Sequence, residues 1–175
     1  MRATTDNLFF RDKVELRKKF LPESKTIHVL DCFYGSGRLW NTIQSETEDK
    51  KILVTGIDKK RLPGILCGDN RKFLQVLNLS EYEVIDLDAY GNTFDQIEIL
   101  LKRKYSGVVF FTWCKRGPGP YPVAVGMTGY HIRSGDIDLA ADRLSNYFHK
   151  RSISFFDVIR VETVGGFNFY DHFVM

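Results

Sequence analysis

The sequence has few of the features that mark membrane, disulfide-rich or unfolded proteins. Its 175 residues include only three cysteines and no C-x-x-C pair, which argues against a disulfide framework and a zinc ribbon. No apolar run approaches the roughly 18–20 residues of a membrane-spanning helix. Neither sign of charge dominates, with 25 Lys and Arg against 22 Asp and Glu. The first residues lack the apolar core of a secretion signal, so we expect a soluble, cytoplasmic protein with no membrane partner.

What remains is the composition of an ordinary globular domain, with 43% apolar and 27% charged residues. At roughly 100–200 residues per domain, the length predicts a single domain over residues 1–175. Within it we expect an N-terminal extension, residues 1–25, and a long functional loop rich in Gly and Pro, residues 114–135.

Short apolar runs alternate with helical periodicity, which predicts a largely parallel sheet covered by helices. Thr93 and Gln96 resemble a capping box at the start of one helix. Two β-rich runs joined by Gly165 and Gly166 predict a final antiparallel hairpin. The expected class is therefore α/β, a Rossmann-like doubly wound sheet with a C-terminal antiparallel hairpin. The expected strands are 27–30, 52–57, 64–66, 83–87, 108–112, 154–164 and 167–174; the expected helices are 38–46, 70–77, 93–105 and one through Ile137 and Phe148.

The strongest local signal is the run Asp31-Cys32-Phe33-Tyr34-Gly35-Ser36-Gly37, between a strand and a helix. Its glycines let a ligand approach the backbone closely, and the helix start offers unpaired N–H groups. A dinucleotide fingerprint would need a third glycine where Trp40 stands, and a phosphate loop would need G-K-[ST]. Neither pattern is present.

This D-x-x-x-G-x-G turn resembles the first motif of the class I S-adenosylmethionine-dependent methyltransferases. The resemblance implies S-adenosylmethionine as cofactor, with Asp31 accepting from its ammonium and the glycines lying under its amino-acid and ribose portions. Asp58, at the end of the second strand, would accept the ribose hydroxyls. The acidic or amide side chain that follows the third strand, Asp69 or Asn70, would hold the adenine amine. The cofactor-binding residues expected are Asp31, Phe33, Gly35, Gly37, Asp58, Lys59, Asp69, Asn70 and Asp86.

The fourth strand ends in Asp86-Leu87-Asp88-Ala89-Tyr90-Gly91. This is similar to the D-x-D-P-[FY]-G sequence of the tRNA guanine exocyclic-amine dimethyltransferases, with Ala89 where Pro is expected. The resemblance implies methyl transfer to an exocyclic amine of a nucleic-acid base, in RNA rather than DNA. Asp88 would accept the N–H of the amine, and Tyr90 would stack on the unstacked base. Asp86 completes the predicted catalytic set as a support for the turn or the cofactor.

Basic residues follow several strands at the edge where the carboxyl ends of parallel strands meet. Such a basic rim suits a nucleic acid, although loops solvated by Lys and Arg explain the same pattern nearly as well. The segment around Arg11 would fold over the cofactor or strap the sheet. The residues expected to contact the target are Arg11, Tyr90, Trp113, Lys115 and Arg116; no metal site is expected.

Two other functions stay open. The same fold would serve as a catalytically weak or inactive module that binds cofactor or partner, as a homo-oligomer or with an accessory recognition subunit. Ala89 in place of Pro motivates this alternative. The second alternative is an amine methyltransferase that acts on DNA, a protein or a small molecule.

Overall fold

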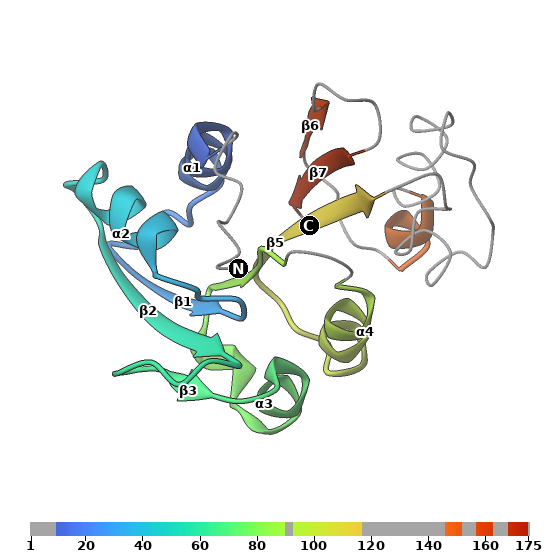
Figure 1. The fold of residues 1–175 in the computed structure, drawn as a ribbon, viewed down its shortest axis with the longest axis horizontal. Coiled ribbons are helices and arrows are strands. Elements are labelled where there is room, and N and C mark those ends of the chain that lie inside the picture. Colours follow the sequence, from blue (N-terminus) through green and yellow to red (C-terminus); the bar gives the residue numbers. More distant parts are fainter. Residues whose placement is uncertain (1–9, 90–92, 117–145, 152–156, 163–167, 175) are drawn as a thin grey trace.

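A computed structural model describes residues 10–89, 93–116, 146–151, 157–162 and 168–174. In this part of the chain seven strands form one sheet in the order β3-β2-β1-β4-β5-β7-β6 (Figure 1). The first five pair in parallel, whereas β7 pairs antiparallel with both β5 and β6. This topology confirms the predicted α/β class and the antiparallel C-terminal pair. The strands are β1 (Thr26–Asp31), β2 (Lys51–Asp58), β3 (Leu66–Cys67), β4 (Val84–Leu87), β5 (Val108–Arg116), β6 (Asp157–Glu162) and β7 (Asn168–Val174).

Helices cover both faces of the sheet. The helices α1 (Phe10–Lys19) and α2 (Arg38–Ser45) lie on one face, and α3 (Asn70–Val76) and α4 (Phe94–Lys102) lie on the other (Figure 1). A short 3-10 turn, η1 (Leu79–Glu81), precedes β4. The strand order reverses between the neighbours β1 and β4. In doubly wound sheets, ligands bind beside the carboxyl ends of the strands at this reversal.

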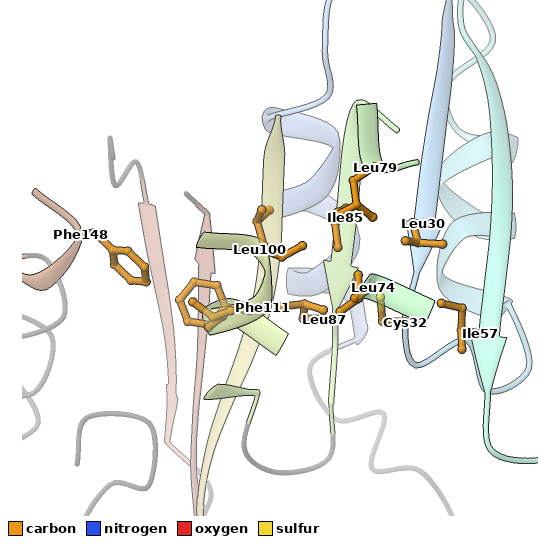
Figure 2. Close-up of a cluster of buried hydrophobic side chains, with 12 residues drawn as sticks. Leu30, Cys32, Ile57, Leu74, Leu79, Ile85, Leu87, Leu100, Phe111 and Phe148 are labelled. Carbon is orange, nitrogen blue, oxygen red and sulfur yellow. The ribbon is translucent and has the colours of Figure 1, made fainter. Parts of the chain in front are cut away.

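The hydrophobic core has two layers because alternate residues of a strand point to opposite faces. Leu30, Ile85 and Leu87 belong to the layer under α3 and α4 (Figure 2). Val29 and Val84 belong to the layer under α1 and α2. Asp31 and Asp86 lie two residues beyond these valines, so both face α1 and α2, and they are direct partners in the β1–β4 register. The fold thus places two carboxylates side by side.

Several predicted boundaries need correction. The fifth strand runs to Arg116, so Trp113, Lys115 and Arg116 pair with β7 instead of lying in a loop. Residues 114–116 of the predicted long loop are therefore strand, and residues 117–145 lie outside the described residues, as do Gly165 and Gly166. Of the expected helix through Phe148, residues 146–149 are described and helical, and Phe148 packs on Phe111.

Two local predictions are wrong. Residues 10–19 of the expected extension form α1, a helix that the sequence pattern did not indicate. The capping box is absent, because Thr93 caps nothing and Gln96 donates to Asn70 instead. Among the described helices, none is long and apolar enough to cross a membrane.

Candidate functional site

Backbone hydrogen bonds join the ends of β1, β2 and β4 at one edge of the sheet. Cys32 N donates to the Asp86 carbonyl at 2.9 Å, and Tyr34 N donates to the Ile57 carbonyl at 3.1 Å. Gly35 N donates to Asp58 Oδ2 at 2.9 Å. The predicted cofactor turn is therefore fixed to both neighbouring strands at the reversal of strand order.

The ring of Tyr34 explains why the turn needs glycine. A Cβ on Gly37 would lie 2.4 Å from Tyr34 Oη, and a Cβ on Gly56 would lie 2.5 Å from the Tyr34 ring. Gly37 also has a φ of 70°, a left-handed conformation that disfavours side chains, and it precedes α2 directly. Gly35 is exposed, and a Cβ there would meet only the Phe33 carbonyl, at 3.8 Å. The backbone at Gly35 is thus open to a ligand.

The carboxylates at the ends of β1 and β2, Asp31 and Asp58, have different surroundings. Asp31 is 4% exposed, and its Oδ1 accepts from Phe33 N at 3.0 Å. Burial, followed by the charge of Asp86, raises the pKa of Asp31 well above its usual value. Asp58 is partly exposed and accepts from Gly35 N and Lys60 N. Each carboxylate oxygen has two lone pairs, so Asp58 has capacity for hydroxyl donors as well.

The residues after β3 support this turn from the other face. Asp69 caps α3: its side-chain hydrogen bonds with Arg71 and one from Arg71 N lower the pKa of Asp69 to about 2. Asn70 is buried, donates to the Cys32 carbonyl at 2.7 Å and accepts from Gln96 at 2.9 Å. The Asn70 amide therefore binds the turn to α4 and is already used within the protein.

Phe33 and Lys59 occupy the flanks of the turn. Phe33 is half-buried against the core layer under α3 and α4. Lys59 is exposed after β2, and its carbonyl accepts a weak hydrogen bond from the Cys67 thiol at 3.7 Å. The structure thus gives Phe33 a packing contact and leaves the Lys59 side chain at the surface.

A buried ion pair attaches α1 to β4. The Arg17 guanidinium donates to both Asp86 oxygens, at 2.7 and 2.8 Å, and Trp40 Nε1 donates to Oδ2 at 2.9 Å. Burial alone would lower the pKa of Arg17, but the charge of Asp86 and the hydrogen bonds to it outweigh burial and raise it. Asp86 is fully buried. Its burial leaves no surface for a target to touch, and the predicted role of Asp86 as a support for the turn or the cofactor stays a prediction.

Asp88, by contrast, lies partly exposed just beyond β4. Lys13 Nζ is 2.8 Å from each of its carboxylate oxygens, and the Thr112 hydroxyl donates to Oδ1. Its side chain is 17% exposed and that of Lys13 is 21% exposed. The predicted acceptor of the target amine is therefore at the surface, in contact with a cation of α1. Tyr90 lies outside the described residues.

Arg11, which was predicted to contact the target, lies exposed on α1. It bonds to Glu46, the residue after α2, and to Glu15 of its own helix. Arg11 and Lys13 are two residues apart, so they point to different sides of α1. The structure therefore separates Arg11 from Asp88.

The predicted basic rim is partly neutralised. Lys59, Lys60 and Arg61 are exposed after β2. Arg71 instead bonds to Asp69 and to Asp95 of α4. Lys115 and Arg116 end β5, in register with Phe169 and Asn168 of β7.

No protein-family model matches this sequence, and no curated protein sequence is similar to it. Solved structures do match. With 1,6-didemethyltoxoflavin-N1-methyltransferase of Burkholderia thailandensis, solved with its substrate and S-adenosylhomocysteine, the TM-score is 0.61 at 13% identity, over 97% of this chain and 78% of that one. With a Listeria monocytogenes protein assigned to the class I S-adenosylmethionine-dependent methyltransferases, the TM-score is 0.56 at 15% identity, over 98% of this chain and 60% of that one. With the Bacillus subtilis M1A22 tRNA methyltransferase TrmK, the TM-score is 0.53 at 12% identity, over 93% of this chain and 64% of that one.

This chain has the class I methyltransferase fold. It spans less than two thirds of the length of the Listeria and Bacillus proteins. Within the fold, Lys13 and Arg17 contact the two carboxylates of the D-x-D motif, and neither residue was predicted from the sequence. Their i, i+4 spacing would place them on one side of a helix, but nothing in the local pattern marks them as buried or paired. In the described part of the chain, no cluster of His, Cys, Asp and Glu fits a metal ion.

Proposed function

We propose that this protein transfers a methyl group from S-adenosylmethionine to an exocyclic amine of a nucleic-acid base, in RNA rather than DNA. The observation that carries the proposal is the meeting of three strand ends. The glycine turn with Asp31, the carboxylate of Asp58 and the partly exposed Asp88 all lie where the strand order reverses. The bound S-adenosylhomocysteine of the Burkholderia enzyme supports the choice of cofactor.

The chain fits the cofactor at three points. Asp31 offers a carboxylate for the ammonium, Gly35 offers a bare backbone, and Asp58 offers acceptors for the ribose hydroxyls. The cofactor supplies an electrophilic methyl group on a positively charged sulfur. The task left to the chain is to orient the acceptor, and alignment of two reactants can contribute roughly 7–11 kcal/mol.

Asp88 is the residue we assign to the target. An exocyclic amine is a weak nucleophile because its lone pair is delocalised into the ring. A carboxylate that accepts an N–H from this amine draws the lone pair back to nitrogen, and it is a base within reach of the proton released after transfer. TrmK, which methylates tRNA, and the exposed Lys59, Lys60 and Arg61 support RNA as the target.

Two experiments test this function. Calorimetry should detect binding of S-adenosylmethionine and S-adenosylhomocysteine, weakened by Asp58→Asn and unaffected by Asp49→Asn, a matched change at an exposed residue between α2 and β2. Labelled S-adenosylmethionine with total tRNA should then yield a methylated nucleoside by mass spectrometry. Asp88→Ala should abolish transfer and keep cofactor affinity. Absence of cofactor binding by the wild type would refute the proposal; label in DNA or only in small molecules would refute the target.

A second function is favoured by the Lys13–Asp88 ion pair, because a cation already contacts the predicted amine acceptor. In this alternative the chain binds the cofactor and a partner without transferring a methyl group by itself. Cofactor binding without transfer to tRNA, DNA or small-molecule amines would support it.

A further inference from the structure

Two buried carboxylates, Asp31 and Asp86, lie side by side under α1. Only Asp31 is proposed to bind a ligand. Asp31 and Asp86 are register partners on strands about 5 Å apart and face the same side of the sheet. Both side chains are almost completely buried. Two like charges at this spacing repel strongly when water is excluded. A group of opposite sign has to compensate them.

Arg17 is that group, and it compensates the pair unequally. It donates two short hydrogen bonds to Asp86, which also accepts from Trp40, so the hydrogen-bond donors of the site are directed to Asp86. Within the described residues, Asp31 receives one hydrogen bond, from the Phe33 backbone, and the charge of Arg17 from a distance. Asp31 is consequently the member of the pair that a proton or a ligand cation can still neutralise.

Among the described residues, few other charged or titratable groups lie around Asp31. Asp88, just beyond β4, adds a second negative charge, and the Cys32 thiol follows directly in the chain. Lys13 of α1 contacts Asp88. Among the residues that the structure describes, Asp31, Asp86 and Asp88 carry three negative charges beside the two positive charges of Lys13 and Arg17. Neither of these two cations forms an ion pair with Asp31.

We propose that Asp86 and Arg17 are positioning residues for the cofactor that act through Asp31: Asp86 engages the Arg17 cation, so that the charge of Asp31 is left for a bound ammonium to balance. The inference rests on the proposed function, since the ammonium is that of S-adenosylmethionine or S-adenosylhomocysteine. The inference predicts that cofactor binding depends on whether Asp31 is protonated.

The sign of the dependence follows from the charges. A protonated Asp31 cannot compensate an ammonium, so cofactor affinity rises as pH increases through the pKa of Asp31 and then levels off. Below that pKa, affinity falls about tenfold per pH unit. Asp86 raises the pKa of Asp31, so removing the Asp86 charge moves this midpoint to lower pH. The charge of Arg17 lowers the pKa of Asp31, so Arg17→Met should move the midpoint to higher pH.

The test is calorimetry of S-adenosylhomocysteine binding between pH 5 and 7.5. This ligand has the ammonium but a neutral sulfur, so the sulfonium charge does not contribute. Asp86→Asn should move the midpoint down by about one pH unit. It should also weaken binding above the midpoint, because Arg17 then compensates the charge of Asp31 in place of the ammonium. Asp88→Asn should shift it less in the same direction. Glu46→Gln, an acid-to-amide change at the far end of α2, should leave it unchanged. Methylthioadenosine, which lacks the ammonium, should bind independently of pH.

The possible results distinguish a failure of this inference from a failure of the proposed function. Wild type that binds no S-adenosylhomocysteine at any pH refutes the proposed function and this inference with it. Wild type that binds, with a midpoint unmoved or raised by Asp86→Asn, refutes the inference alone. Asp86→Asn keeps a polar side chain of the same shape, and Asp88→Asn provides the same readout outside the buried pair should the first variant fail to fold.

Discussion

The Lys13 ammonium on α1 lies 2.8 Å from each carboxylate oxygen of Asp88, 75 residues later in the chain. One helical turn on, Arg17 contacts Asp86 in the same way. Four helical residues rise about 6 Å and two strand residues about 6.6 Å, so a K-x-x-x-R helix matches a D-x-D strand end. The first helix of the chain therefore orients the motif proposed for catalysis.

We predict that Lys13→Met slows methyl transfer by roughly ten- to hundredfold and leaves cofactor affinity unchanged. The reason is that Asp88 loses two charge-assisted hydrogen bonds and with them a fixed orientation, and small errors of position cost rate. Lys13→Arg should restore most of the rate. The measurement is kcat and KM for transfer beside calorimetry of S-adenosylhomocysteine.

Lys18→Met is the control for this change, since Lys18 is on the same helix but pairs with Glu46 and Glu15. It should transfer at the wild-type rate. A Lys13→Met protein that is faster than wild type would show that Lys13 competes with the target amine for Asp88, and the orienting role would be wrong.

The Arg17–Asp86 pair predicts a large effect on stability. Arg17→Met leaves Asp86 buried without its cation, which should lower the free energy of unfolding by about 3–5 kcal/mol. The double change of Arg17→Met with Asp86→Leu should lose less than the single change, because no buried charge is left alone. Urea unfolding measures both. If Arg17→Met costs under about 1 kcal/mol, the pair is not the anchor of α1.

The sheet could be predicted because its strands are marked by local sequence. The apolar runs of β1, β2 and β4 were located to within two residues, since buried parallel strands read as short continuous apolar segments. Asp31 and Asp58 were placed at strand ends for the same reason: each is the first charged residue after such a run.

The helix α1 could not be predicted in this way. Its buried residues include Arg17, and a buried arginine looks like a solvent-facing residue in any pattern of hydropathy. Its partner Asp86 is 69 positions away, so no local spacing indicates the pair. The burial of Asp86 could not be predicted for the matching reason, because the motif gives a carboxylate in sequence but not the cation that covers it.

Two helix starts provide a matched prediction about capping. Asp69 accepts from Arg71 N and caps α3, whereas the Thr93 hydroxyl before α4 is buried with no partner in the described part of the chain. Asp69→Ala should cost about 1 kcal/mol. Thr93→Val should be neutral or stabilising, because a methyl group replaces an unpaired buried hydroxyl. The measurement is the urea midpoint of each variant.

The cap at Asp69 also predicts a pH dependence. The pKa of Asp69 is about 2 when folded, below the unfolded value of about 3.9. Its contribution is therefore complete above about pH 4 and is lost as pH falls toward 2. The stability difference between wild type and Asp69→Ala should shrink over that range. A difference that stays constant from pH 5 to 2 would contradict the assigned cap.

The last prediction separates two reasons for glycine in this fold. Gly37 and Gly64 have φ values of 70° and 76°, so alanine strains the backbone equally at both, by about 1–2 kcal/mol. A Cβ at Gly64 meets nothing within 4 Å, whereas a Cβ at Gly37 would overlap the Tyr34 ring. Gly37→Ala should therefore cost clearly more stability than Gly64→Ala and should also weaken cofactor binding, because Tyr34 must move within the turn. Urea unfolding and calorimetry on the two variants decide it: equal losses with equal cofactor affinity would mean that the Tyr34 ring yields freely and that backbone conformation alone requires glycine at position 37.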